Sequence, residues 1–133
     1  MIIWTEDKLI EQGYKIHNAK ITSVDLSTAA YCIADLRIAI EGDGWGCVLG
    51  GYSLAYAGTS LKLEEINGHK KGFEEILYIM WTLGTDSLQD LKGRYIRVAT
   101  KGWGDTVKII GHITKDQWFD YKSFFYKGIE ADE

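Results

Sequence analysis

The 133-residue sequence contains no proline, although average usage would supply about six or seven at this length. A proline-rich linker, a collagen-like repeat and a polyproline ligand are therefore excluded. Only 2 cysteines are present, Cys32 and Cys47. We expect both to be small buried hydrophobic residues, because free cysteine is among the most buried residue types, while a disulfide between them stays an open alternative.

Long apolar runs and an excess of basic residues are also missing. No run of 18 apolar residues occurs, and the first residues lack the positive segment of a signal peptide, so we expect a cytoplasmic protein without a targeting segment. The net charge is −4, but residues 1–129 hold 15 cations against 16 acids. A chain with no excess of positive charge is not expected to bind duplex DNA. We also expect no membrane partner.

The composition that is present fits one folded unit. The chain has 46% hydrophobic residues, 26% charged residues and 15 glycines, which must build most of the turns. We expect a single domain over 1–133, with a short N-terminal helix or arm at 1–13 and an acidic tail at 128–133.

Apolar periodicity and capping residues predict the elements. They are a short helix between Thr5 and Gly13, strands over 14–26, 31–41 and 47–56, a polar loop over 57–70, a helix over 73–83 that ends at Gly84, a short helix over 88–91, a hairpin of 94–100 and 107–113, and a helix over 115–127. This order predicts an α+β fold with an antiparallel sheet, one central apolar helix, a short second helix and an aromatic-rich C-terminal helix.

The same periodicity predicts which side chains are buried. On strand 31–41 the core-facing set is Cys32, Ala34, Leu36, Ile38 and Ile40, and on strand 47–56 it is Val48, Tyr52, Leu54 and Tyr56, with a bulge or close approach at Gly50 and Gly51. The central helix carries a stripe of Phe73, Ile76, Leu77, Met80 and Leu83. Tyr78, Ile79 and Trp81 make that helix apolar on nearly every side, so we expect part of it to face a partner.

The C-terminal segment concentrates aromatic side chains. Its six aromatics are at positions 118, 119, 121, 124, 125 and 126, with Trp118, Tyr121 and Phe125 in one helical stripe. Contact with another subunit and packing in the monomer core are both open interpretations.

Catalytic and metal-binding patterns are missing from the sequence. His17, His69 and His112 are scattered, without the spacing of a metal site, and no Gly-x-Ser-x-Gly motif occurs. Glu41 and Asp43 bracket a glycine turn, which is typical of solvated turn residues. We therefore expect no enzyme, no metal and no cofactor.

A basic hairpin is the more informative segment. Between residues 92 and 108 the only acid is Asp105, and the cations are Lys92, Arg94, Arg97, Lys101 and Lys108. Trp103 lies at its tip in a Gly-Trp-Gly sequence, which also occurs at 44–46 around Trp45. Bared backbone amides, cations and an indole ring together can bind a nucleotide, while a plain hairpin with solvated charges explains the same residues. His112 and Lys115, beyond the second strand, could add donors.

Three segments resemble a known family. Gly42-Asp-Gly-Trp-Gly-Cys-Val-Leu-Gly-Gly-Tyr52, Leu91-Lys-Gly-Arg-Tyr-Ile-Arg-Val98 and Ile110-Gly-His-Ile-Thr-Lys-Asp-Gln-Trp-Phe119 are similar to motifs of the Thoeris anti-defence family of type one. Its phage and prophage members resemble molecular sponges that sequester cyclic ADP-ribose isomers, and some also bind cyclic oligonucleotides.

The resemblance implies a homo-oligomer, built from dimers, that binds its signal at a subunit interface without cleaving it. Trp103 best matches the family's aromatic residue, and His112 stands where relatives carry asparagine. The sequence departs from the family at Leu77 and Tyr78, where relatives carry arginine, and its C-terminal cations reduce to Lys122 and Lys127.

We expect a cyclic nucleotide ligand and seven ligand-binding residues: Trp103, His112, Arg97, Lys101, Trp45, Tyr78 and Lys127. The alternative is a small phage inhibitor that binds a host defence protein directly, such as an anti-CRISPR protein, with the acidic tail mimicking phosphates. A small hydrolase acting on the nucleotide is a third hypothesis, for which the sequence offers no metal or nucleophile pattern.

Overall fold

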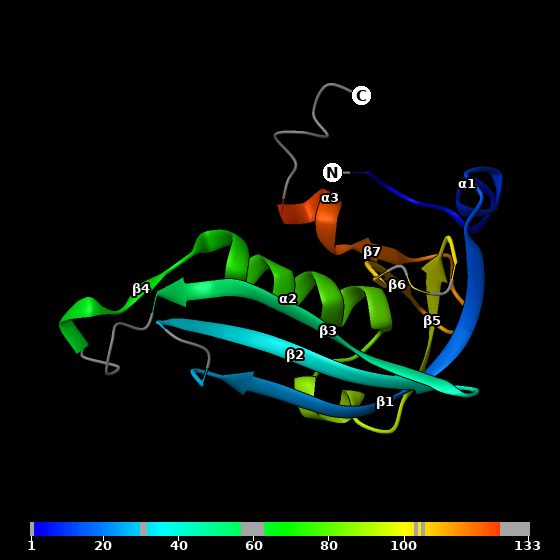
Figure 1. Ribbon diagram of the computed structural model, residues 1–133. Coiled ribbons are helices and arrows are strands. Elements are labelled where there is room, and N and C mark those ends of the chain that lie inside the picture. The colour runs from blue at the N-terminus through cyan, green and yellow to red at the C-terminus, as the bar shows by residue number, and fades with distance from the viewer. Residues whose placement is uncertain (1, 30–31, 57–62, 103, 105, 126–133) are drawn as a thin grey trace.

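The computed structural model describes residues 2–29, 32–56, 63–102, 104 and 106–125 (Figure 1). These residues form an α+β fold with a seven-stranded antiparallel sheet, as the sequence predicts. The elements in chain order are α1 (Glu6–Glu11), β1 (Lys15–Ser27), β2 (Ile33–Gly42), β3 (Trp45–Tyr56), the 3-10 helix η1 (Leu63–Glu65), β4 (Asn67–Gly68), α2 (Lys70–Leu83), the 3-10 helix η2 (Leu88–Leu91), β5 (Tyr95–Thr100), β6 (Ile109–Gly111), β7 (Trp118–Asp120) and α3 (Tyr121–Phe125).

The sheet is organised around β1, which belongs to both of its halves. The strand order is β4-β3-β2-β1-β5-β6-β7. The first part of β1, Lys15–Lys20, pairs with β5, and the part from Lys20 onwards pairs with β2, with a register shift between Ile21 and Ser23. The long β1–β3 meander therefore lies to one side, and β5–β7 curl away from it towards α2 (Figure 1).

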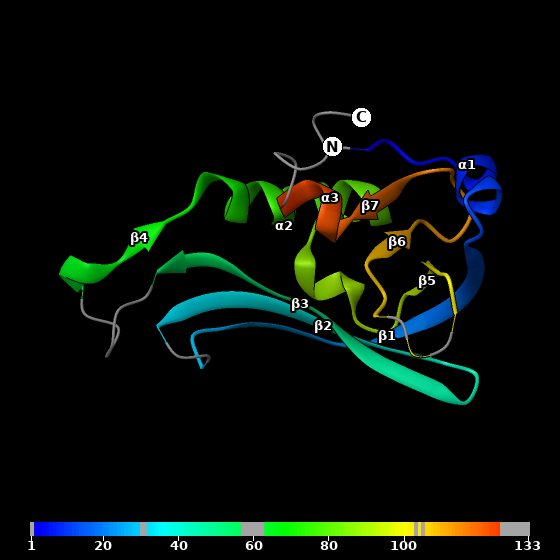
Figure 2. The ribbon, with the colours of Figure 1, turned by 45° about the horizontal axis from the view of Figure 1, so that its top comes forward.

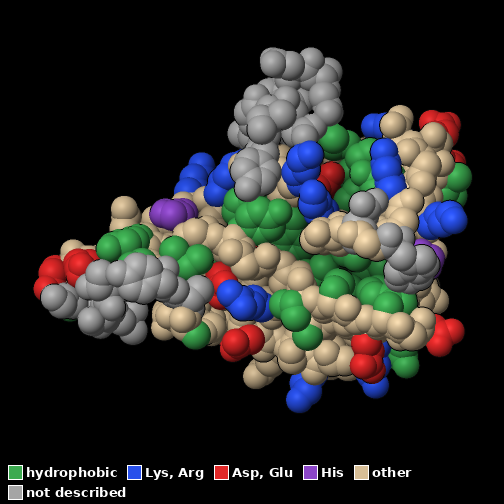
Figure 3. Space-filling view, in the orientation of Figure 1, with side chains coloured by type: hydrophobic (Ala, Val, Ile, Leu, Met, Phe, Trp, Pro, Cys, Tyr) green, Lys and Arg blue, Asp and Glu red, His purple; other side chains and the backbone are tan. Residues whose placement is uncertain are grey.

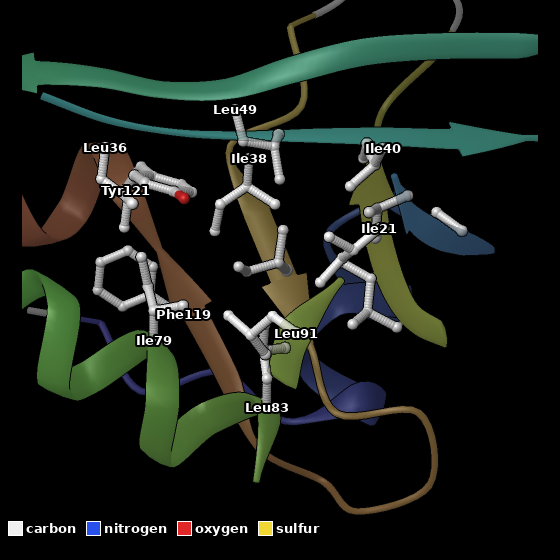
Figure 4. Close-up of a cluster of buried hydrophobic side chains, with 14 of the residues drawn as sticks. Ile21, Leu36, Ile38, Ile40, Leu49, Ile79, Leu83, Leu91, Phe119 and Tyr121 are labelled. Carbon is white, nitrogen blue, oxygen red and sulfur yellow. The ribbon is translucent and has the colours of Figure 1, made fainter. Parts of the chain in front are cut away.

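The main core lies between these two layers. In Figure 2 strands β1–β3 form the lower layer, with α2, β7 and α3 above them. Figure 4 shows side chains from both layers pointing towards one another, including Ile38 of the sheet, Ile79 of α2 and Phe119 of β7. Ile38, Ile79 and Phe119 have no exposed surface, so the helix and the curled sheet bury a common apolar interior.

A second, smaller cluster covers the opposite face of β5 and β6. It consists of Leu9, Ala99, Ile109 and Trp118, with Trp4, Tyr14 and Ile16 packed around them. Helix α1 supplies Leu9, and the Thr5 side chain caps that helix by accepting a hydrogen bond from the Lys8 amide, as the sequence predicts. The N-terminal segment is therefore docked on the sheet.

The β2–β3 hairpin shows how glycine sets strand geometry. Its two-residue turn is Asp43-Gly44, one of the strongest hairpin signals. Gly50 has φ +96°, and a Cβ there would lie 2.1 Å from the Leu36 carbonyl oxygen, which confirms the expected close approach. The irregular pairing at this point changes which side chains of β3 point to the core. As a result, Leu49 is buried while Val48 is 59% exposed. The expected inward position of Val48 is therefore wrong.

The buried face of α2 also differs from the predicted stripe. Phe73 and Leu77 are 64% and 51% exposed, whereas Ile79 is buried. Gly72 explains the difference, because a Cβ on it would lie 2.4 Å from the Leu54 backbone of β3. This contact turns the face that carries Gly72 and Ile79 towards the sheet and leaves Phe73 and Leu77 outside.

The C-terminal helix is confirmed but begins later than expected, at Tyr121. Residues 118–120 form β7 instead, because their pairing with β6 satisfies backbone groups and buries Trp118 and Phe119 on opposite faces of the sheet. Tyr121 and Phe124 are also buried, and Phe125 stacks on Tyr52 with ring centroids 4.4 Å apart. The described aromatic residues of this segment therefore pack within the monomer.

Three further expectations have mixed outcomes. Cys32 and Cys47 are free thiols and only half-buried. The expected polar loop contains η1 and the two-residue strand β4, while its residues 57–62 lie outside the described part of the chain. The acidic tail at 128–133 also lies outside it.

Candidate functional site

Antiparallel pairing brings five segments to one end of the sheet. Tyr14 precedes β1, Lys101 follows β5, Lys108 precedes β6 and Asp120 ends β7. Because each of these strands runs opposite to its neighbour, the start of one lies beside the end of the next. The Tyr121 amide donates a hydrogen bond of 2.8 Å to the Lys108 carbonyl, which places helix α3 at the same end.

A cleft of about 270 Å³ lies among these residues, and we call it the lysine cleft. Its lining includes Tyr14, Thr106, Asp120 and the three lysines Lys101, Lys108 and Lys122. On the face shown in Figure 3, Lys and Arg side chains gather near the C-terminal end of the described chain. Among the described residues, no acidic side chain forms an ion pair with these lysines. The cleft therefore concentrates positive charge on a protein whose net charge is negative.

Neighbouring groups orient two members of the lysine cleft. The Lys101 ammonium lies 5.0 Å from the centroid of the Tyr14 ring, a cation–π contact. The buried Asp120 carboxylate accepts hydrogen bonds from the Trp4 indole at 2.9 Å and from the Ser123 amide at 3.1 Å. These neutral donors orient the Asp120 carboxylate at the wall of the cleft, where its single negative charge offsets part of the positive charge of the three lysines.

A second pocket, of about 250 Å³, adjoins the lysine cleft, and we call it the indole pocket. It is lined by Trp45, His17 and Val107 and by the backbone of Gly102 and Gly104, and it shares Thr100 and Thr106 with the lysine cleft. A ligand with a charged part and a planar apolar part has a matching surface on each side of these threonines.

The Arg97 side chain is occupied by contacts with other residues of the same chain. Its guanidinium forms an ion pair with Glu6 and lies 4.7 Å from the centroid of the Trp118 ring. It also donates hydrogen bonds to the carbonyls of His112 at 2.8 Å and Lys115 at 2.9 Å. The structure thus brings Arg97 and His112 together, in an arrangement that fastens α1 and the segment before β7 to the sheet.

His112 is held as a neutral side chain. Its Nδ1 accepts hydrogen bonds from the amides of Thr114 at 3.1 Å and Lys115 at 3.0 Å, which leaves the proton on Nε2. Burial lowers the pKa of His112, and the cations Lys115, Arg94 and Arg97 lower it further. It therefore adds no positive charge near neutral pH.

The remaining predicted residues are dispersed. Lys101 lines the lysine cleft and Trp45 the indole pocket. Arg97 lies on β5, four residues before Lys101, which is a separation of roughly 13 Å along an extended chain. Tyr78 lies on α2, where its ring packs against Trp81, Phe119 and Phe124. Trp103 and Lys127 lie outside the described residues.

Sequence reasoning missed the contributions of Tyr14, Asp120 and Lys122 to the lysine cleft. All three lie outside the basic hairpin and carry no local motif. The predicted antiparallel hairpin already indicated that Lys101 and Lys108 end on the same side. Placing Tyr14 and Asp120 there also required the strand order.

No protein-family model, curated protein or solved structure matches this chain. The described His, Cys, Asp and Glu residues form no cluster that could hold a metal ion. None of the described helices has the length and apolar character needed to cross a membrane.

Proposed function

We propose that this protein binds a cyclic nucleotide immune signal, a cyclic ADP-ribose isomer or a cyclic oligonucleotide, and sequesters it without cleavage. The lysine cleft carries the proposal, because three ammonium groups without acidic partners among the described residues converge at its walls. Phosphate oxygens are the groups that such donors bind best. The adjoining indole pocket offers an apolar surface for a base.

Sequestration is an equilibrium mechanism. The protein would lower the free signal in the host bacterial cytoplasm in proportion to its own concentration and affinity, so protection would need no turnover. Lys108 and Lys122 would contact the phosphates, Lys101 would be held in place by Tyr14, and the base would lie towards Trp45. The resemblance of the glycine-rich strand supports the proposal through Trp45, which lines the indole pocket.

Replacing Lys108 with alanine is expected to weaken ligand binding about 10-fold or more, since a hydrogen bond to a charged group contributes about 1.5–3 kcal/mol. The double variant Lys108→Ala/Lys122→Ala should lose about 100-fold if both ammonium groups contact phosphate. Isothermal titration calorimetry with cyclic ADP-ribose isomers and cyclic di- and trinucleotides measures both values.

Lys92→Ala is the matched control, because Lys92 is exposed on the same basic segment but does not line the cleft. It should leave the affinity within about twofold of the wild type. If Lys92→Ala and Lys108→Ala lose affinity equally, the loss reflects only the lower total positive charge of the protein. That result would contradict the assignment of the lysine cleft as the binding site. A parallel titration of Trp103→Ala tests the sequence-based expectation for that indole.

Heating the complex separates sequestration from hydrolysis. A sequestered signal should return to solution intact when the protein is denatured, and chromatography should recover all of it. Recovery of a cleaved product would overturn the proposal in favour of a hydrolase. If no nucleotide binds and a host defence protein co-purifies instead, direct inhibition is the function. The lysine cleft favours sequestration, whereas the acidic tail that suggested direct inhibition lies outside the described residues.

A further inference from the structure

Strand β3 has an outer edge that no other strand covers over most of its length. On its inner edge β3 pairs with β2 along the whole hairpin. On the outer edge β4 pairs only with Ala55 and Tyr56, at the end of β3 that is far from the hairpin turn (Figure 1). No further strand of the described chain pairs with this edge. A sheet edge presents backbone N–H and C=O groups that can bind another molecule.

The register of the hairpin decides which backbone groups point outwards. A two-residue turn is closed by a hydrogen-bonded pair, here Gly42 and Trp45, and hydrogen-bonded pairs then recur at every second position. Cys47 therefore also directs its N–H and C=O at β2. The N–H and C=O of Gly46 and Val48 point away from β2, and none of them pairs with another backbone group of the described residues.

These outward groups border the indole pocket. Gly46 and Val48 both line it. Gly46 has no side chain, and the side chain of Val48 lies on the outer face of the sheet, since Cys47 and Leu49 on either side of it pack against the core. The backbone of Gly46 and Val48 is therefore the part of the edge that meets the pocket.

We propose that this backbone edge binds the base of the nucleotide, an inference that rests on the proposed function. The Gly46 C=O accepts a hydrogen bond from the base, and the Val48 N–H donates one to it. The two groups follow one another along the edge, so they need a donor and an acceptor side by side. Adenine carries this pair at N6 and N1, and guanine carries it at N1 and O6. Trp45 and Val107, which also line the pocket, supply an apolar wall for the ring.

Size and backbone geometry favour a base over an extended peptide. Addition of a strand needs a regular edge over several residues, but Gly50 and Gly51, with φ +96° and +84°, interrupt the edge soon after Val48. The pocket of about 250 Å³ is smaller than the roughly 300–1,000 Å³ of sites for whole drug-sized ligands, so it suits one ring system. The phosphates joined to that base then lie in the lysine cleft, which shares Thr100 and Thr106 with the pocket.

Val48→Pro removes the outward N–H and keeps the pairing with β2, because that N–H is not part of the β2–β3 ladder. Calorimetric titration with the tightest ligand among the cyclic ADP-ribose isomers and cyclic di- and trinucleotides should show at least about 10-fold weaker binding. Val48→Ala is the matched control, since it shortens the side chain on the outer face and keeps the N–H. It should bind within about twofold of the wild type. Inorganic pyrophosphate, which has no base, should bind Val48→Pro as it binds the wild type, and should bind Lys108→Ala about 10-fold more weakly.

The ligand offers a second test, on the wild-type protein. A methyl group on the ring nitrogen of the bound side of the base, N1 of a purine, removes one hydrogen bond and occupies the space beside the Val48 N–H. The affinity should fall at least about 10-fold. Replacement of N7 by carbon, on the other side of the same ring, is the matched control and should change the affinity by no more than about twofold.

Equal affinity of the wild type for the methylated and the parent nucleotide overturns the proposal. So does unchanged nucleotide binding by Val48→Pro, or a tightest ligand whose purine N1 already forms the ring-closing bond. The Lys108→Ala titration still decides the proposed function in these cases, whereas a wild type that binds none of the nucleotides overturns both. If Val48→Pro loses pyrophosphate as well, the substitution has disturbed the lysine cleft, and the methylated nucleotide decides.

Discussion

Replacing Glu75 with glutamine is expected to remove most of the loss of stability that the protein undergoes between about pH 5 and about pH 9. Glu75 is 1% exposed on the sheet-facing side of α2, and neither of its carboxylate oxygens has a hydrogen-bond partner among the described residues. Burial, and to a smaller extent the nearby carboxylate of Asp35, raises the pKa of Glu75 to about 8. The side chain is therefore mostly protonated in the folded protein at neutral pH.

The direction of the effect follows from proton uptake. Below about pH 4.5 Glu75 is neutral both folded and unfolded, so it causes no loss. As the pH rises towards 8 the unfolded chain releases this proton while the folded chain keeps it, and the free energy of unfolding falls. Above the folded pKa the loss levels off, at a total on the order of 5 kcal/mol.

Urea unfolding of Glu75→Gln and wild type at about pH 5, 7 and 9 measures this difference. The neighbouring Glu74→Gln is the matched control, because Glu74 is exposed and should leave the pH profile of the wild type unchanged. A Glu75→Gln variant that keeps the full pH dependence would show that another group titrates.

Gly72→Ala is expected to destabilise the protein by about 2 kcal/mol or more, even though alanine is the better helix former by about 1 kcal/mol. The added methyl group would lie 2.4 Å from both the Cα and the carbonyl oxygen of Leu54, and backbone atoms cannot move aside as a flexible side chain can. Helix α2 would have to withdraw from β3, which would loosen the packing around Ile79. Thermal unfolding should show a midpoint lower by roughly 8 °C.

Gly68→Ala is the control for this substitution. Gly68 precedes the same helix, no atom lies within 4 Å of a Cβ built on it, and its φ is not positive. It should change the free energy of unfolding by no more than about 0.5 kcal/mol. Equal stability of Gly72→Ala and wild type would mean that α2 is not seated on Leu54 as described.

Local chemistry made much of the fold predictable. Thr5 as a helix cap, Gly84 as a helix end with φ +76° and Asp43-Gly44 as a hairpin turn all act over a few residues, so the sequence pattern carries them directly. The order of strands and helices, and with it the α+β class, followed from these signals and from the apolar alternation of β2.

Residue facing was less predictable, because it depends on contacts that are distant in sequence. Aromatic residues at helical spacing indicated a helix from Lys115, yet pairing with β6 draws residues 118–120 into a strand. The glycines at 50 and 51 indicated a bulge, but only the partner strand shows that Leu49, and not Val48, faces the core. A one-residue change of register reverses the face of every side chain that follows.

The candidate site likewise has features that the sequence predicts and features that depend on the tertiary structure. The sequence by itself determined the fold class, the basic composition of the 92–108 hairpin and the glycines around its tryptophan, since these depend on residue type and short spacing alone. The tertiary structure decided that Lys122, Tyr14 and Asp120 join Lys101 and Lys108, and that Arg97 is engaged by Glu6 and Trp118. The physical reason is that antiparallel strand order brings chain segments more than 100 residues apart to one end of the sheet, whereas periodicity records only neighbours along the chain. The missing prolines agree with a chain whose tight turns and close approaches, at Gly44, Gly50 and Gly84, are built on glycine.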